Sequence, residues 1–297
     1  MPEKNLVFSH FCDWSHCPDS MLPSCFAEFN DLGADNLVFL SGWLSRILKD
    51  PMFFGALKHA AKNRVKFTDM HAVYGECYDL ACMSPARREE LVRDHSLALA
   101  YASELGCRSY TIHIGAYNSV FFQTPNEVLR PCALETLEKL IPAAEKYGVV
   151  IAVENSYERS NTPDEVMYYV NAVNHPMVKC CVDCGHANML EYHPGKDNYG
   201  SYIKNEVWWG SIEHENQAFE KMASKIVTCH LHDNDGYDDQ HLPPGMGSVN
   251  WEKIADNLLN NAPELRSIQS EASIFSTGIS IKDYVSRFRK IFPSLIK

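Results

Sequence analysis

Six apolar segments of the chain end in side chains that can bind a metal ion or carry a proton. They end in Thr-Asp-Met-His71, Ile-His113-Ile-Gly, Val-Glu154-Asn-Ser, Val-Asp183-Cys-Gly-His186, Cys-His230-Leu-His232-Asp233 and Ser-Glu271-Ala-Ser. A carboxylate buried in such an apolar setting is destabilising unless a cation or a proton compensates its charge. We therefore interpret Glu154, Asp183 and Glu271 as functional groups.

Three of these carboxylates and one imidazole form a coherent ligand set: Glu154, Asp183, Glu271 and His230. An oxygen-rich site of this kind suits Mn²⁺, Mg²⁺, Co²⁺ or Zn²⁺, and the set contains no thiolate that would select zinc. The sequence predicts one divalent metal ion on these residues. The ligand set does not select among the four ions, and Mn²⁺ is the one that we expect. The other histidines carry less weight, because a lone histidine on a strand is more often a hydrogen-bonded core residue than a ligand.

The segments that carry these residues belong to a regular series of strands and helices. Short apolar, β-branched runs predict strands over residues 5–10, 36–42, 65–72, 109–116, 149–156, 178–187, 226–234 and 266–273. A helical pattern follows each run, as in repeated βαβ units with a parallel sheet.

Local signals mark the ends of several helices. Ser84-Pro85 and Thr162-Pro163 are typical N-termini, in which a capping hydroxyl precedes a proline in the first turn. Gly106 is the expected end of the first of these helices. A third helix is predicted to begin near Pro125 and to end at Gly148, directly before the next strand.

The uniform order of eight strand–helix units favours an α/β fold of the (β/α)₈ TIM barrel type over an open, doubly wound sheet. No Gly-x-Gly-x-x-Gly motif follows the first strand, so the sequence lacks the main evidence for a dinucleotide-binding sheet. The 297 residues, 45% of them apolar, suit one barrel, and we expect a single domain over residues 1–297. In this fold the C-terminal strand ends meet at one mouth, where the predicted ligands would gather.

Composition and charge narrow the class of function. The formal net charge is −11 and we find no basic run, which disfavours a nucleic-acid partner. The sequence has no long uncharged apolar run and no typical secretion leader, so we expect a cytoplasmic protein without a membrane partner. The eleven cysteines are odd in number and scattered, which predicts free thiols, with Cys181 and Cys184 along one strand.

Three motifs together resemble the xylose-isomerase-like TIM barrels, a superfamily that includes sugar (phosphate) isomerases and epimerases and the AP endonucleases of family 2. The motifs are Ile-Ala-Val-Glu154-Asn, Cys-Val-Asp183-Cys-Gly-His186-Ala and the segment from His230-Leu-His232-Asp233 to Gly245-Met-Gly247. The resemblance, which spans almost the whole chain, implies the metal ligands Glu154, Asp183, His230 and Glu271. It further implies that Glu154 and Glu271 are the acid/base pair, that His186 contacts a substrate oxygen, and that the protein forms a homodimer.

The endonuclease branch of this superfamily is an alternative. Its members hold three zinc ions on further ligands, so we regard five more residues as candidates for additional metal or substrate contacts: His71, His113, His186, Asp239 and His241. Against this branch, the loop from His230 to Asp239 is shorter than in the repair enzymes, and Gly185 stands where they carry cysteine. The chain also departs from the epimerases, because many of them place an arginine near the position of His241 and this chain has none there, so the resemblance does not define the substrate contacts.

The expected reaction is the isomerisation or epimerisation of a sugar or keto-polyol. A base removes the proton next to a carbonyl, an enediolate forms, and the proton returns on the other face or at the neighbouring carbon. The same intermediate can expel a β-substituent, so a lyase or dehydratase that acts on a keto-sugar or a 3-keto-glycoside is an alternative, as is a carbohydrate-binding barrel without catalysis. His10 and Trp14 are predicted to form part of a wall for the sugar.

Overall fold

The computed structural model describes residues 6–12, 18–192 and 194–296. Its eight strands are β1 (Val7–Ser9), β2 (Asn36–Phe39), β3 (Lys66–His71), β4 (Ser109–Ile112), β5 (Val150–Glu154), β6 (Val178–Asp183), β7 (Ile226–Leu231) and β8 (Ser267–Ser270). The α-helices are α1 (Leu22–Asp31), α2 (Ser41–Lys49), α3 (Met52–Ala61), α4 (Pro85–Leu105), α5 (Tyr117–Phe122), α6 (Asn126–Tyr147), α7 (Pro163–Val173), α8 (Cys184–Leu190), α9 (Ala218–Met222), α10 (Trp251–Asp256), α11 (Ile274–Thr277) and α12 (Ile281–Ile291). Short 3₁₀- or π-helical segments cover Asp19–Met21, Arg159–Asn161, Tyr202–Val207, Ala223–Lys225 and Asn257–Asn261.

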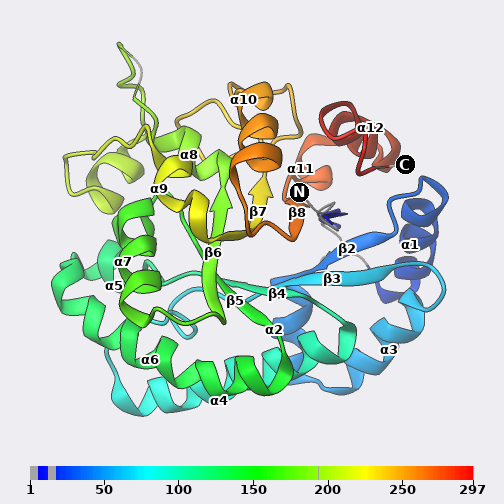
Figure 1. Ribbon diagram of the computed structural model, residues 1–297, viewed down its shortest axis with the longest axis horizontal. Coiled ribbons are helices and arrows are strands. Elements are labelled where there is room, and N and C mark those ends of the chain that lie inside the picture. Colours follow the sequence, from blue (N-terminus) through cyan, green and yellow to red (C-terminus); the bar gives the residue numbers. More distant parts are fainter. Residues whose placement is uncertain (1–5, 13–17, 193, 297) are drawn as a thin grey trace.

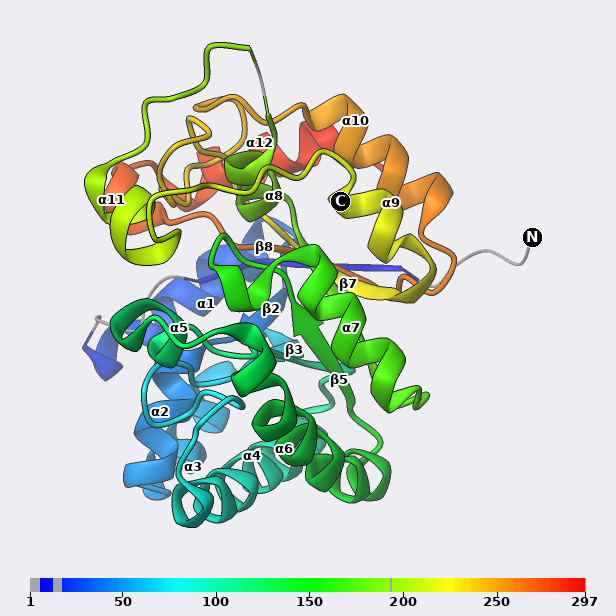
Figure 2. The same cartoon turned by 90° about the vertical axis from the view of Figure 1, so that its left-hand side faces the viewer.

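The strands form one parallel sheet in the order β1-β8-β7-β6-β5-β4-β3-β2. The sheet closes where β1 meets β2: the His10 N–H donates to the Asn36 carbonyl at 2.8 Å, and the Val38 N–H donates to the His10 carbonyl at 3.0 Å. Helices surround the strands on the outside (Figure 1), and the long helices α4 and α6 lie side by side (Figure 2). The predicted (β/α)₈ TIM barrel is confirmed.

The helix ends follow the local sequence signals. Ser84 caps α4 by accepting the Arg87 N–H, and Thr162 caps α7 by accepting the Glu165 N–H. Helix α4 ends at Gly106, whose φ of 84° is left-handed, and α6 ends at Gly148 in the same conformation, with φ of 67°. These boundaries were therefore predictable, because each depends on residues close in the sequence.

The strands are shorter than the apolar runs that predicted them. The clearest difference lies in the run 178–187, because β6 ends at Asp183 and α8 begins at the next residue. The Asp183 carboxylate accepts the His186 N–H at 2.6 Å and so caps this helix. Cys184 is consequently helical, and the prediction that Cys181 and Cys184 lie along one strand is wrong. The described cysteines are free thiols.

A polar layer fills the interior of the barrel below its mouth. The Asp69 carboxylate of β3 is fully buried and accepts hydroxyl hydrogen bonds from Ser9, Ser109 and Ser267 at 2.9, 2.7 and 2.7 Å. These serines come from β1, β4 and β8, so one carboxylate ties together strands from different parts of the chain. Side chains two residues further along a strand point into the same interior, one layer closer to the mouth.

A small second core supports one side of the mouth. It consists of Val120, Met189, Leu190, Tyr199, Ile203, Val207 and Trp208, from α5, α8 and the segment that follows α8. The Trp208 indole is almost fully buried and donates to the Tyr157 carbonyl at 3.0 Å. Among the described residues, no helix has the length and apolar character that a bilayer crossing requires.

Candidate active site

The alternation of side chains along the strands brings the predicted ligands into the mouth. His71 lies two residues after Asp69, and Glu154, Asp183 and His230 occupy the inward positions near the ends of β5, β6 and β7. Glu271 follows β8 directly. The ligand atoms of Glu154, Asp183, His230 and Glu271 all lie within 4.8 Å of one another, so the structure brings these four residues together.

The geometry of this group fits a divalent cation. His230 Nδ1 lies 2.8 Å from Glu154 Oε1 and 2.9 Å from Glu271 Oε2, so the two carboxylates approach one imidazole nitrogen. Asp183 is fully buried, and its Oδ2 atom has no hydrogen-bond partner. A buried carboxylate oxygen without a donor is costly unless a cation neutralises it. The donor set of three carboxylates and one imidazole therefore matches what Mn²⁺, Mg²⁺, Co²⁺ or Zn²⁺ binds.

Neighbouring polar groups hold Asp183 in place. The Asn155 side chain bridges β5 and β6, because its Oδ1 accepts the Asp183 N–H at 2.9 Å and its Nδ2 donates to the Asp183 carbonyl at 3.1 Å. Such contacts fix the orientation of a ligand before a metal binds. Sequence reasoning quoted Asn155 in a motif and gave it no role, since nothing local shows that its partner is the next strand.

Two further histidines contact the same carboxylates. His113 Nε2 lies 3.0 Å from Glu154 Oε2, and His71 Nε2 lies 3.5 Å from the same oxygen. The His71 Nδ1 atom lies 2.7 Å from the Ala72 carbonyl oxygen, which assigns the proton to Nδ1. The lone pair of Nε2 is therefore directed into the site. Tyr74 stacks on His113 with 5.5 Å between ring centroids. His71 and His113 are thus placed to hold a metal or to meet a substrate.

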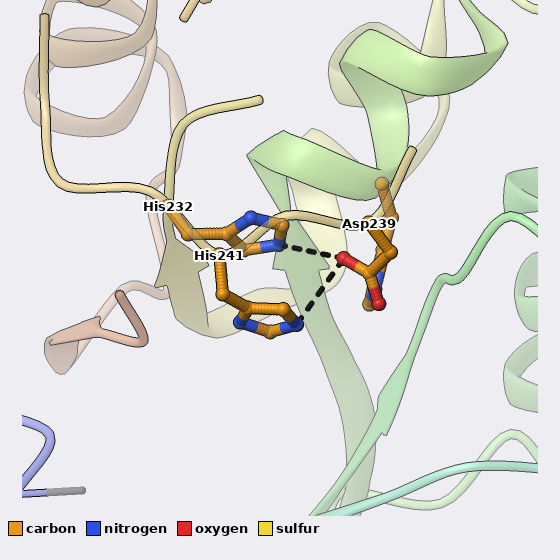
Figure 3. A group of neighbouring side chains, drawn as sticks. His232, Asp239 and His241 are labelled. Carbon is orange, nitrogen blue, oxygen red and sulfur yellow. Dashed lines mark ion pairs between the residues drawn. The ribbon is translucent and has the colours of Figure 1, made fainter. Parts of the chain in front are cut away.

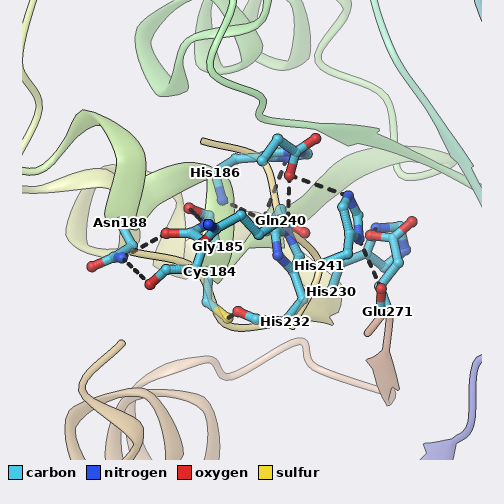
Figure 4. A network of polar contacts seen from close by, with 12 residues as sticks. Cys184, Gly185, His186, Asn188, His230, His232, Gln240, His241 and Glu271 are labelled. Atoms are coloured by element: carbon cyan, nitrogen blue, oxygen red, sulfur yellow. Dashed lines mark hydrogen bonds and ion pairs between the residues drawn. The ribbon is translucent and has the colours of Figure 1, made fainter. Parts of the chain in front are cut away.

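A second group of ligand-type side chains lies beside the first. It consists of His186, His232, Asp239 and His241, whose ligand atoms also lie within 4.8 Å of one another. The Asp239 carboxylate lies 3.2 to 3.8 Å from a nitrogen of each of the three imidazoles. Figure 3 shows it facing His232 and His241, and Figure 4 shows these two histidines near His186. His186, Asp239 and His241 were candidates from the sequence, whereas His232 was quoted at the end of a strand and was given no role. Its position two residues after His230 was the signal that could have identified it.

The charges of the two groups shift the pKa values of their members. Burial by itself raises the pKa of Glu154, but His230 and His113 outweigh it and hold that pKa well below its usual range. Burial lowers the pKa of His241, yet Asp239 more than compensates and raises it to about 10. Both shifts have the same cause, because the carboxylates and the imidazoles of the mouth stabilise each other's charged forms.

A family model for the xylose isomerase-like TIM barrel matches residues 54–265 of the chain. The chain belongs to this family. This xylose isomerase-like barrel is 25% identical to an uncharacterised protein of Methanocaldococcus jannaschii over 185 residues, which are 59% of the chain and 56% of that protein. The chain thus matches little more than half the length of that curated relative.

Solved structures share the fold of this xylose isomerase-like barrel. A D-tagatose 3-epimerase-like protein has a TM-score of 0.69 and 21% identity, with 97% of this chain and 98% of that chain covered. The 3-keto-D-glucoside 4-epimerase of E. coli has a TM-score of 0.66 and 15% identity, with 98% of both chains covered. At such low identities the similarity shows a common fold.

The structure does not bring His10 into the mouth. In β1 and its extension, Ser9 points inward to Asp69, whereas the His10 ring lies on the other face, 4.8 Å from the Phe8 ring and 6.0 Å from the Phe29 ring. Burial and the charge of Arg289 lower the pKa of His10 to about 3, so the ring is neutral. The prediction that His10 helps to bind substrate is therefore wrong. Trp14, the other predicted wall residue, lies outside the described residues.

A cavity of about 150 Å³ opens beside the first group, next to His113. Aromatic side chains line much of it, among them Tyr74, Tyr117 and Tyr202. Asp79 and Glu158 add carboxylates to the lining. The lining of this cavity is thus both apolar and acidic, and such a lining suits hydroxyl-rich, uncharged molecules better than phosphates.

Proposed function

We propose that the protein is a divalent-metal-dependent isomerase or epimerase of a sugar or keto-polyol, which acts by proton abstraction next to a carbonyl. The observation that carries the proposal is the arrangement of Glu154 and Glu271, two carboxylates from β5 and β8 that converge on His230 Nδ1 at 2.8 and 2.9 Å. The similarity in fold to a D-tagatose 3-epimerase-like protein and to a 3-keto-D-glucoside 4-epimerase supports a sugar as substrate.

Glu154 and Glu271 differ in their surroundings in a way that suits two proton-transfer roles. Glu154 is fully buried and bonded to His113 through Oε2, whereas Glu271 is slightly exposed. A substrate carbon held between them meets a carboxylate on each face, so one can remove a proton and the other can return one. Return to the opposite face gives epimerisation, and return to the neighbouring carbon gives isomerisation.

Glu154, Asp183, His230 and Glu271 would hold the metal ion. When bound there, a divalent ion supplies charge that polarises the substrate carbonyl and stabilises the enediolate. The carboxylates of this group orient the substrate. The aromatic side chains that line the cavity beside His113 limit the access of water. We expect Mn²⁺ to be the ion.

The test is the exchange of carbon-bound protons with deuterium in D₂O. The metal-loaded protein is incubated with a panel of ketoses and keto-sugars, and we expect exchange at a carbon next to the carbonyl of at least one sugar. Glu154→Gln and Glu271→Gln should each lower the exchange rate by more than about 100-fold, as expected for the loss of a general base. Asp238→Asn, at an exposed position beside Asp239, is the matched control and should keep the rate.

Product analysis separates the alternatives. Loss of a β-substituent with the same exchange would reassign the reaction to a lyase or dehydratase. If the parent chain turns over no sugar and Glu154→Gln binds sugar as tightly as the parent chain, the protein is a carbohydrate-binding protein. Cleavage of a DNA duplex at an abasic site without sugar exchange would contradict the proposal and favour the endonuclease, which the acidic residues Asp79 and Glu158 near the mouth disfavour.

A further inference from the structure

Helix α8 carries two residues of the candidate site at its start. Asp183, one of the candidate metal ligands, is its N-cap, and His186 lies in its first turn. The helix begins where β6 ends, at the mouth of the barrel (Figure 1). It has seven residues, and a helix of two turns does not form without support from its surroundings. The contacts that hold α8 therefore also determine where Asp183 and His186 lie.

The end of α8 lacks the usual termination signal. Its C-cap residue, Glu191, has an extended backbone with φ of −63° and ψ of 126°, so no left-handed glycine closes the helix. The last four carbonyl groups of an α-helix have no partner within the helix. The Ala187 carbonyl still accepts the Glu191 N–H, so the carbonyls of residues 188–191 are the ones that need other donors.

The segment between α8 and α9 supplies these donors. The Lys196 ammonium group donates to the carbonyl oxygens of Asn188, Met189 and Glu191 at 2.9, 3.0 and 2.8 Å. The Tyr199 hydroxyl donates to the Met189 carbonyl at 2.6 Å, and the Glu215 N–H donates to the Leu190 carbonyl at 2.9 Å. Each of the four carbonyls thus has a donor, and Lys196 reaches three of them.

Lys196 is buried in a setting that keeps its charge at the end of the helix. Burial lowers the pKa of Lys196 to about 8, and the charges of Glu191 and Asp235 offset part of this effect. The rings of Tyr199 and Tyr237 lie 5.4 and 5.7 Å from Lys196 Nζ. The ammonium group is therefore charged at neutral pH, and a positive charge is favourable at a helix C-terminus. Its three N–H groups match three carbonyl acceptors.

The rest of α8 is packed too closely to adjust to a shift of its end. A Cβ atom on Gly185 would overlap the His232 ring, so the start of the helix lies directly against the end of β7. The Asn188 side chain donates to Asn234 Oδ1 at 2.8 Å. Because close-packed interiors transmit small displacements, a shift at the C-terminal end of α8 reaches Asp183.

We propose that Lys196 is a positioning residue of the candidate active site, which clamps the end of α8 and so holds Asp183 in the orientation that a metal ion requires. The inference rests on the metal site of the proposed function and does not depend on the sugar reaction. Asp183 then has two supports, namely Asn155 on β5 and, through the helix, Lys196. Groups that orient a ligand in this way typically contribute about 10- to 100-fold to metal affinity.

The test compares two lysines of the same segment. Lys196→Met keeps an unbranched side chain and removes the three donors. Lys204→Met is the matched control, because Lys204 donates to the carbonyl and the carboxylate of Asp197, at 2.9 and 2.7 Å, and not to α8. Each protein is titrated with Co²⁺ up to one ion per chain, and the visible absorption of the bound ion reports its ligand geometry. Lys196→Met should bind Co²⁺ about 10-fold more weakly, with a changed spectrum, whereas Lys204→Met should match the parent chain.

Amide hydrogen exchange, followed by mass spectrometry, is a second readout. The N–H groups of residues 184–191 should exchange faster in Lys196→Met, while those of α4 and α6 keep the rates of the parent chain. Tyr199→Phe removes one bond to the same helix end and should show a smaller change in the same direction. This milder variant replaces Lys196→Met if that protein does not fold.

Two results would overturn the positioning role. One is the Co²⁺ affinity and spectrum of the parent chain in folded Lys196→Met, or in Tyr199→Phe if it replaces that variant. The other is an equal loss of affinity in Lys196→Met and Lys204→Met. If the parent chain binds no Co²⁺, the metal site of the proposed function and the role of Lys196 at it are both refuted. Neither readout uses a sugar, so the role of Lys196 and the proposed reaction can fail separately.

Discussion

Replacement of His10 by phenylalanine tests whether this residue is structural. The ring packs among Phe8, Phe29, Tyr284 and Phe288, with centroid distances of 4.8 to 6.5 Å. Its Nδ1 atom is buried without a hydrogen-bond partner. A phenylalanine ring can occupy a similar place in this cluster and cannot titrate. The His10→Phe variant should therefore keep its sugar-exchange rate and change only the pH dependence of stability.

The magnitude follows from the pKa of the buried ring. Burial and Arg289 lower that pKa to about 3 from the ordinary value of 6.5, so the unfolded chain binds the proton more readily than the folded chain. The contribution of neutral His10 is fully present above pH 6.5 and is lost progressively as the pH falls toward 3. Between about pH 7.5 and about pH 5, this linkage removes about 2 kcal/mol from the free energy of unfolding.

The assay is urea unfolding of the parent chain and of His10→Phe at about pH 7.5 and about pH 5. The difference in unfolding free energy between the two proteins should shift by about 2 kcal/mol in favour of the variant at the lower pH. Other histidines titrate in both proteins and cancel in this comparison. An identical difference at both pH values would refute the buried, neutral ring. A loss of exchange rate without a change in stability would place His10 at the substrate.

Three further predictions concern stability and are measured by urea unfolding. Asp233→Asn should lower the free energy of unfolding by about 3 kcal/mol, because the buried carboxylate accepts the N–H groups of Asn234, Gly245 and Val249 and the Trp251 indole. Gly247→Ala should cost about 1–3 kcal/mol, since a Cβ atom there would lie 2.3 Å from the Asn234 carbonyl oxygen. Ser84→Ala removes the cap of α4 and should cost about 1 kcal/mol.

Each of these predictions has an outcome that contradicts it. Full stability of Asp233→Asn would mean that the four donors find other partners, such as water. Full stability of Gly247→Ala would mean that the loop can move away from the Asn234 carbonyl. For the cap, Ser84→Asp is the matched variant, and it should restore most of what Ser84→Ala loses because aspartate also caps helices. Equal stability of the two variants would contradict the capping role.

The sequence by itself determined the order of the elements and the residues of the first candidate site. The ends of α4, α6 and α7 depend on neighbours in the chain, namely the caps Ser84 and Thr162 and the glycines at 106 and 148, and such local signals do not need the rest of the fold. Glu154, Asp183 and His230 could be selected because each stands at the end of an apolar strand, and a parallel barrel places all such ends at one mouth.

Only the tertiary structure decided which face of each strand carries a side chain and which distant residues meet. The strands of a parallel barrel are buried on both faces, so their sequences do not show whether His10 points to the interior or to the helices. The pairing of Gly185 with His232 depends on how closely α8 packs against the end of β7. That distance is a property of the packed barrel, because the two residues lie far apart in the chain and neither carries a local signal for the other.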